Sequence, residues 1–227
     1  MKKHSKNLKV KWIINSSFAA ITTIASTSAL SDTSLNAYQG KNGVAMLLES
    51  DGRRTFVISG GALPRGTATA ADCLAKIKLT KNRPPNYFEG HLASTNNSIS
   101  RLDRSDIDGK LGGLYVLKNK VRVGGIDTSG ICPDGIDFYG NYAEINKNSL
   151  SYISTFIYFL DLISQDATNS LDEESNAIDE IKPFIDNKPK KCDNNPKCKS
   201  IFDSSHAVYM KLIDSNKHLS TKESVTK

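Results

Sequence analysis

The chain has 227 residues and a formal charge of +6, from 30 Lys and Arg against 24 Asp and Glu. Five lysines and no acids lie in residues 1–31, so the remaining residues carry 25 basic and 24 acidic side chains, a net charge of +1. A nearly neutral body in which basic residues do not alternate with aromatic ones argues against nucleic acid as a partner.

The chain begins with a basic segment, MKKHSKNLKVK, and a mostly apolar one, WIINSSFAAITTIASTSAL. This layout is typical of a secretory signal peptide, which we assign to residues 1–31. The apolar segment is barely long enough to span a bilayer and contains seven Ser or Thr, so we prefer a cleaved signal to a membrane anchor. Small residues permit cleavage after Ser31, which we favour, or after Ala37. We therefore predict a protein of the periplasm or the extracellular space, without a stable membrane anchor.

Four cysteines, Cys73, Cys132, Cys192 and Cys198, follow the predicted signal. An even number of cysteines in an exported chain predicts disulfides. We favour the pairs Cys73–Cys132 and Cys192–Cys198, because the members of each pair fall in one segment of the chain. A zinc site is the alternative, although the sequence contains no Cys-x-x-Cys motif and no nearby histidine pair.

Residues 32–147 alternate short apolar runs with turn residues, which predicts an antiparallel β domain. We expect about seven strands, at residues 44–49, 53–59, 73–80, 87–95, 113–117, 121–125 and 136–145, with Gly90 and Gly140 at bends or bulges. In the third of these, Cys73 and every second residue after it face the core, and Lys76 faces solvent. The two prolines in residues 81–86 predict a loop.

Residues 148–218 have an apolar period near 3.6, which predicts a helical subdomain of about three helices. Ser170 and Glu173 have the spacing of a capping box before the second helix, which Pro183 should end or kink. Residues 219–227 have little to bury and should form a flexible tail. The predicted fold class is α+β and β-rich, a small antiparallel β-barrel or sandwich followed by helices.

Acidic residues gather in the first part of the helical region. Residues 148–181 contain seven acids and no Lys or Arg, whereas residues 182–199 contain six lysines and two acids. An acid-only segment suits docking to a cationic partner such as a lysozyme-like hydrolase; a solvated helix face is the alternative. The candidate binding residues are Asp161, Asp166, Asp172, Glu173, Glu174, Asp179 and Glu180.

Two short motifs are candidates for chemistry. Glu89 and His91 share one face of a predicted strand, as a general acid–base pair requires, although alternate polar residues usually form the solvent face. Asp103, Asp106 and Asp108 resemble part of an EF-type calcium loop, but Arg104 and Tyr115 stand where its first and last ligands should be. A charged loop or a short helix capped by Asp103 is the structural alternative for these aspartates.

Tyr139 and Tyr142 should lie on opposite faces of their strand, so one of them can join the core while the other serves recognition; Tyr139 is our candidate binding residue. The sequence contains neither a phosphate-binding loop nor a dinucleotide fingerprint, so we expect no cofactor. It also contains no nucleophile motif. We therefore expect an exported binding protein, such as an inhibitor or immunity-like partner of a cationic envelope hydrolase. A structural or stress-related envelope protein and a hydrolase using Glu89 and His91 are the alternatives.

Overall fold

The computed structural model describes residues 33–61, 72–83, 85–169 and 174–225. The predicted signal, residues 1–31, and the predicted capping box of Ser170 and Glu173 lie outside these residues. Ala37 lies inside the first strand and is fully buried. Cleavage after Ala37 would therefore cut that strand, whereas cleavage after Ser31 would leave it whole.

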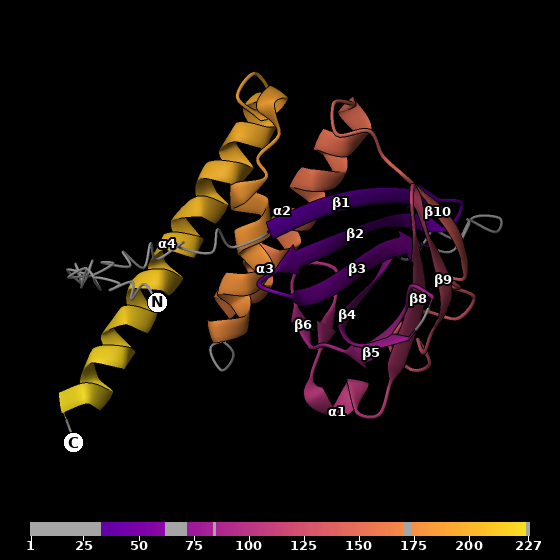
Figure 1. Ribbon diagram of the computed structural model, residues 1–227, viewed down its shortest axis with the longest axis horizontal. Helices are drawn as coiled ribbons and strands as arrows, with labels where there is room; N and C mark the ends of the chain where they lie inside the picture. The colour runs from indigo at the N-terminus through magenta and orange to yellow at the C-terminus, as the bar shows by residue number, and fades with distance from the viewer. Residues whose placement is uncertain (1–32, 62–71, 84, 170–173, 226–227) are drawn as a thin grey trace, which may run out of the picture. The chain divides into compact units, whose positions relative to one another are not determined.

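Eight antiparallel strands form a closed barrel in the order β1-β10-β9-β8-β5-β4-β3-β2 (Figure 1). The strands are β1 (Thr33–Gly40), β2 (Gly43–Ser50), β3 (Arg53–Gly61), β4 (Asp72–Arg83), β5 (Tyr87–Leu92), β8 (Leu111–Leu117), β9 (Lys120–Ile126) and β10 (Gly140–Glu144). A second, two-stranded sheet of β6 (Thr95–Asn96) and β7 (Arg101–Leu102) and the short helix α1 (Arg104–Ile107) connect β5 to β8. The β-rich α+β fold class is confirmed, and of the two predicted architectures the protein has the barrel.

Three of the strand predictions were wrong. The strand predicted at residues 136–145 is shorter, because β10 begins only at Gly140. No strand was predicted at residues 33–40, but β1 lies there and closes the barrel by pairing with both β2 and β10. The loop predicted from residue 81 begins later, because β4 continues to Arg83. The bulge expected near Gly90 is present, since the register between β4 and β5 shifts between Leu79, the partner of Gly90, and Lys81.

The barrel interior is filled by side chains. Alternate residues of the strands point inward, including Phe56, Ile77, Leu114 and Tyr142, and all four are 1% exposed or less. At one end of β3 the guanidinium of Arg54 pairs with Glu49 and lies 4.5 Å from the centre of the Phe88 ring. At the other end a disulfide connects Cys73 to Cys132 in the loop before β10.

Three long helices follow the barrel: α2 (Leu150–Asn169), α3 (Glu174–Asp186) and α4 (Pro196–Val225). Helices α2 and α3 pack on β1 and β2 (Figure 1). Outward-facing Leu35, Met46 and Leu48 form a second core with Phe156 and Phe184 of these helices. Helix α3 includes Pro183 and continues to Asp186, so the proline does not end it. Helix α4 continues to Val225 and so includes most of the predicted tail, residues 219–227.

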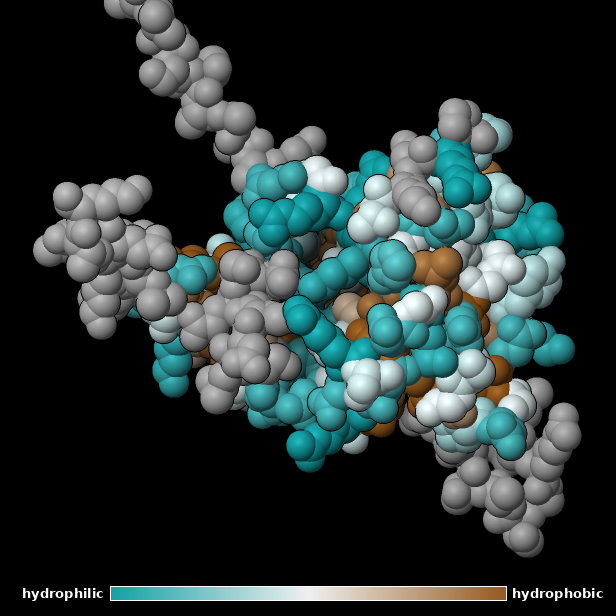
Figure 2. All heavy atoms as spheres, turned by 90° about the horizontal axis from the view of Figure 1, so that it is seen from below, coloured by the Kyte–Doolittle hydropathy of each residue, from teal (hydrophilic) through white to brown (hydrophobic). Residues whose placement is uncertain are grey.

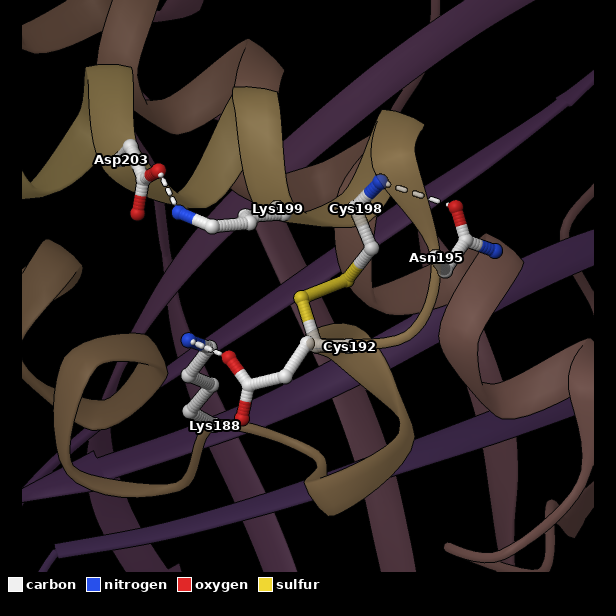
Figure 3. The surroundings of a disulfide bond; sticks show 7 residues. Lys188, Cys192, Asn195, Cys198, Lys199 and Asp203 are labelled. Carbon is white, nitrogen blue, oxygen red and sulfur yellow. Dashed lines mark hydrogen bonds and ion pairs between the residues drawn. A yellow bond between two sulfur atoms is a disulfide. The ribbon is translucent and has the colours of Figure 1, made fainter.

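The second disulfide, Cys192–Cys198, joins the 3-10 helix η1 (Lys190–Cys192) to the first turn of α4 (Figure 3). Asn195 caps that turn, because its side-chain oxygen accepts a hydrogen bond from the Cys198 amide at 3.0 Å. Both predicted pairings are thus confirmed. None of the helices in the described part of the chain is both long and apolar enough to span a membrane.

Candidate functional site

The seven predicted acidic binding residues do not form one exposed surface. Asp161 is exposed, and Asp179 pairs with Arg53 of β3. Asp166 and Glu180 are buried, at 4% and 7% exposure, so their assignment to a docking surface was wrong. Asp172 and Glu173 lie outside the described residues, and Glu174 begins α3 but its side chain is not among those described.

The two buried carboxylates surround a buried lysine. Lys76 of β4 is 7% exposed, and its Nζ donates to Asp166 Oδ2 at 3.2 Å and to Glu180 Oε2 at 3.0 Å. The expectation that Lys76 faces solvent was therefore wrong. Burial lowers the pKa of Lys76, but Glu180 and Asp166 outweigh this effect and hold it above the usual lysine value. This buried ion triad joins the barrel to both α2 and α3.

Asp166 has two further donors, which explains how its charge is tolerated inside the protein. Its Oδ1 accepts hydrogen bonds from the Asn96 backbone amide at 2.7 Å and from Asn97 Nδ2 at 2.9 Å. A buried carboxylate is stable only where such partners replace its water. The triad is thus a structural element, because Lys76, Asp166 and Glu180 all bind groups within the chain.

Glu89 and His91 lie on one face of β5, as predicted, at a partly buried and an exposed position, but only one of the two lines a cleft. His91 is exposed and lines a cleft, together with Lys78, Arg104 and Asp108. Glu89 is not part of the cleft lining. It accepts a hydrogen bond from Tyr87 and lies 4.0 Å from Arg83. Of the residues proposed for catalysis or metal binding, the cleft therefore brings together only His91 and Asp108.

The other two aspartates of the predicted calcium motif organise the short helix α1. Asp103 is its N-cap residue, and the Asp106 carboxylate accepts a hydrogen bond from the Asp103 amide at 2.7 Å. The predicted short helix capped by Asp103 is confirmed. Among the described residues, no three His, Cys, Asp or Glu side chains are grouped so that they could hold a metal ion.

Tyr139 is exposed and Tyr142 is buried, as predicted, with exposures of 51% and 1%, but only Tyr142 belongs to β10 and Tyr139 lies in the loop before it. Tyr139 belongs to a group that the sequence did not reveal. Its phenol oxygen accepts a hydrogen bond from Arg122 Nη2 at 3.0 Å. Arg122 pairs across the sheet with Tyr115, and Tyr115 pairs with Tyr87. We call Tyr87, Tyr115, Arg122 and Tyr139 the tyrosine–arginine row.

Local structure holds the row in place on the outer face of the barrel. The rings of Tyr87 and Tyr115 are 4.9 Å apart, centre to centre, and inclined by 50°. The Tyr87 hydroxyl crosses Gly113 so closely that a Cβ atom on this glycine would lie 2.2 Å from it. Tyr115 is 37% exposed, while its neighbours Leu114 and Val116 point into the barrel. The rings of Tyr87 and Tyr115 are therefore held by contacts within the chain, and Tyr139 is joined to the row by its hydrogen bond with Arg122.

Comparison of the chain with protein-family models, curated proteins and solved structures gave no match. Its function must therefore be inferred from its own residues.

Proposed function

We propose that the protein is an exported, non-catalytic binding protein that recognises a protein partner with an acidic surface through the tyrosine–arginine row. The observation that carries this proposal is a row of side chains in contact, in which Tyr115, Arg122 and Tyr139 are exposed and the partly buried Tyr87 packs against Tyr115. Tyrosine and arginine are enriched among the residues that dominate binding energy at protein interfaces. Tyrosine also loses little conformational entropy on binding, and here neighbouring residues already hold the rings.

The charges beside the row favour an acidic partner. Lys118 and Lys120 lie in the hairpin that joins β8 to β9, and Lys120 pairs with the exposed Leu117. Carboxylates next to the row already have partners: Glu89 interacts with Tyr87 and lies near Arg83, and Asp137 accepts a hydrogen bond from the Tyr139 amide. Complementary charge speeds association and excludes wrong partners. This proposal reverses the sign of the partner expected from the acidic helices, since two of their carboxylates are buried.

The two disulfides support the exported location, because structural disulfides persist in oxidising compartments. Closure of the barrel supports a rigid scaffold, because the barrel has no free sheet edge. Binding through such a surface needs no change in the backbone.

A photo-crosslinking experiment tests the proposal. A photoreactive phenylalanine is placed at Tyr115 or, as control, at the exposed Asp161 on α2, and crosslinked proteins from the natural host are identified by mass spectrometry. We expect one dominant acidic partner from position 115 and none from position 161. A partner crosslinked only from position 161 would instead support docking through the acidic helices.

The affinity of the purified partner then gives a quantitative test. Tyr115→Ala and Arg122→Glu should each raise Kd about 30-fold or more, as residues that dominate an interface do. Lys197→Glu makes the same charge change as Arg122→Glu at an exposed position of α4 and should leave Kd nearly unchanged. Equal losses from Arg122→Glu and Lys197→Glu would show general charge attraction and contradict the proposed site.

A further inference from the structure

A cleft of about 550 Å³ lies between the outer face of the barrel and the helix α1. Lys78 of β4 and His91 of β5 are cross-strand partners on its wall, and Arg104 and Ser105 of α1 face them from the other side. Figure 2 shows the molecule from below, the side on which α1 lies, with hydrophobic side chains set among hydrophilic ones. Volumes of this size are typical of sites for small molecules.

The charge of the lining is positive. Lys78 and Arg104 contribute two positive charges and Asp108 one negative charge, which leaves +1 with His91 neutral. Lys78 and Arg104 each also interact with another group of the protein, so a bound anion would share them with those groups. The guanidinium group of arginine presents paired N–H donors that match the two oxygens of a carboxylate or phosphate group. Ser94 and Ser105 add hydroxyl groups to the lining.

The rest of the lining suits a ligand with an apolar part. Leu92, Ala93 and Ile107 are part of the cleft, and each is at most 8% exposed. A free inorganic ion would leave the small exposed part of these side chains in contact with water. An organic anion of modest size would cover it and place its charged group near Arg104 and Lys78.

We propose that this cleft binds a small organic anion, a molecule with one carboxylate or phosphate group on a short apolar body. The positive side chains hold the anionic group, and the apolar residues hold the body of the ligand. The site is separate from the tyrosine–arginine row, so the proposal does not depend on the proposed function.

Titration with defined anions tests this site. Phenyl phosphate and benzoate are the two organic probes, and inorganic phosphate lacks the apolar body. Binding is followed by two-dimensional NMR of the backbone amides, with Ser94 and Gly109 as reporters from the cleft. We expect saturable shifts of these amides with at least one organic probe, and tighter binding of phenyl phosphate than of inorganic phosphate. No saturation by either organic probe below about 10 mM would overturn the proposal, as would equal Kd values for the two phosphates.

Matched variants separate the cleft from general charge attraction. Arg104→Gln and Lys78→Gln should each raise Kd about 10-fold or more, the effect of losing one charge-assisted hydrogen bond. Arg104→Lys keeps the charge but loses the paired donors, so it should bind less tightly than the parent protein and more tightly than Arg104→Gln. Arg101→Gln removes an exposed arginine that does not line the cleft and should leave Kd unchanged. Equal losses from Arg101→Gln and Arg104→Gln would overturn the assignment.

Discussion

Replacement of Lys76 by methionine should destabilise the protein severely. Methionine has nearly the length of the lysine chain and fills most of its space, so the change removes the charge and leaves little cavity. Asp166 and Glu180 then remain buried without their cation, although each was within 3.2 Å of it. Removal of one partner from a buried ion pair costs about 3–5 kcal/mol, because the remaining charge is neither hydrated nor paired.

The two carboxylates should contribute unequally to this loss. Asp166 keeps the hydrogen bonds from Asn96 and Asn97, whereas the side-chain contact found for Glu180 is with Lys76. The double variant Lys76→Met/Glu180→Met should therefore recover about half of the loss, since it removes the carboxylate with the poorer environment.

Urea unfolding, followed by circular dichroism with the disulfides intact, measures both effects. For a typical m-value of about 2 kcal/mol/M, Lys76→Met should lower the midpoint by about 2 M. Lys118→Met removes an exposed lysine and should change the free energy of unfolding by less than about 0.5 kcal/mol. A loss below about 1 kcal/mol for Lys76→Met, or no recovery in the double variant, would refute the view that the triad is paired and desolvated.

Three further predictions concern stability. In the chain-entropy model, removal of Cys73–Cys132, with a sequence separation of 59, should lower the free energy of unfolding by about 4 kcal/mol, and removal of Cys192–Cys198, with a separation of 6, by about 2.4 kcal/mol. Urea unfolding of the two double-serine variants measures both losses, and a larger loss for Cys192–Cys198 would contradict the model. Gly90→Ala should cost about 2–3 kcal/mol, because its Cβ would lie 1.9 Å from the Lys78 carbonyl oxygen, whereas Gly125→Ala, with nothing within 4 Å, should cost less in the same assay. Burial raises the pKa of Tyr38, Tyr142 and Tyr152 to about 12 in the folded chain. Because the unfolded chain loses these protons at lower pH than the folded chain does, the urea midpoint should fall as the pH rises from about 10 to 12. A constant midpoint would contradict the burial of the three tyrosines.

The sequence predicted most of the barrel because inward and outward residues alternate along its strands. Phe56 and Ile58 face the interior while Val57 faces the helices. Such an alternation can be recognised from a few consecutive residues of the sequence. The sequence did not distinguish a barrel from a sandwich, because closure depends on β1 pairing with β10, about 100 residues later. Residues 33–40 were missed since they follow the predicted signal directly.

The tyrosine–arginine row could not be found from sequence spacing. Tyr87, Tyr115 and Arg122 come from three strands, and only the register of the barrel makes them neighbours. Tyr139 is exposed and Tyr142 is buried, as predicted, but strand alternation is not the reason, because Tyr139 lies before the first residue of β10. The sequence contained no indication that Arg122 would be the partner of Tyr139.

The buried acids, by contrast, left a signal in the sequence. Asp166 follows Ile163 by three residues and so continues the apolar stripe of α2. Glu180 follows the buried Ala177 by three residues and precedes the buried Phe184 by four, so it lies on the buried face of α3. A carboxylate on the buried face of a helix needs a cation, and a lysine on the covered face of a strand can supply one. A count of charges treats Asp166 and Glu180 as surface residues, whereas their position in the helical period predicts that they are buried. Helical position is therefore the better guide to which acids of residues 148–181 remain available to a partner, and it leaves Asp161 as the clearest of them.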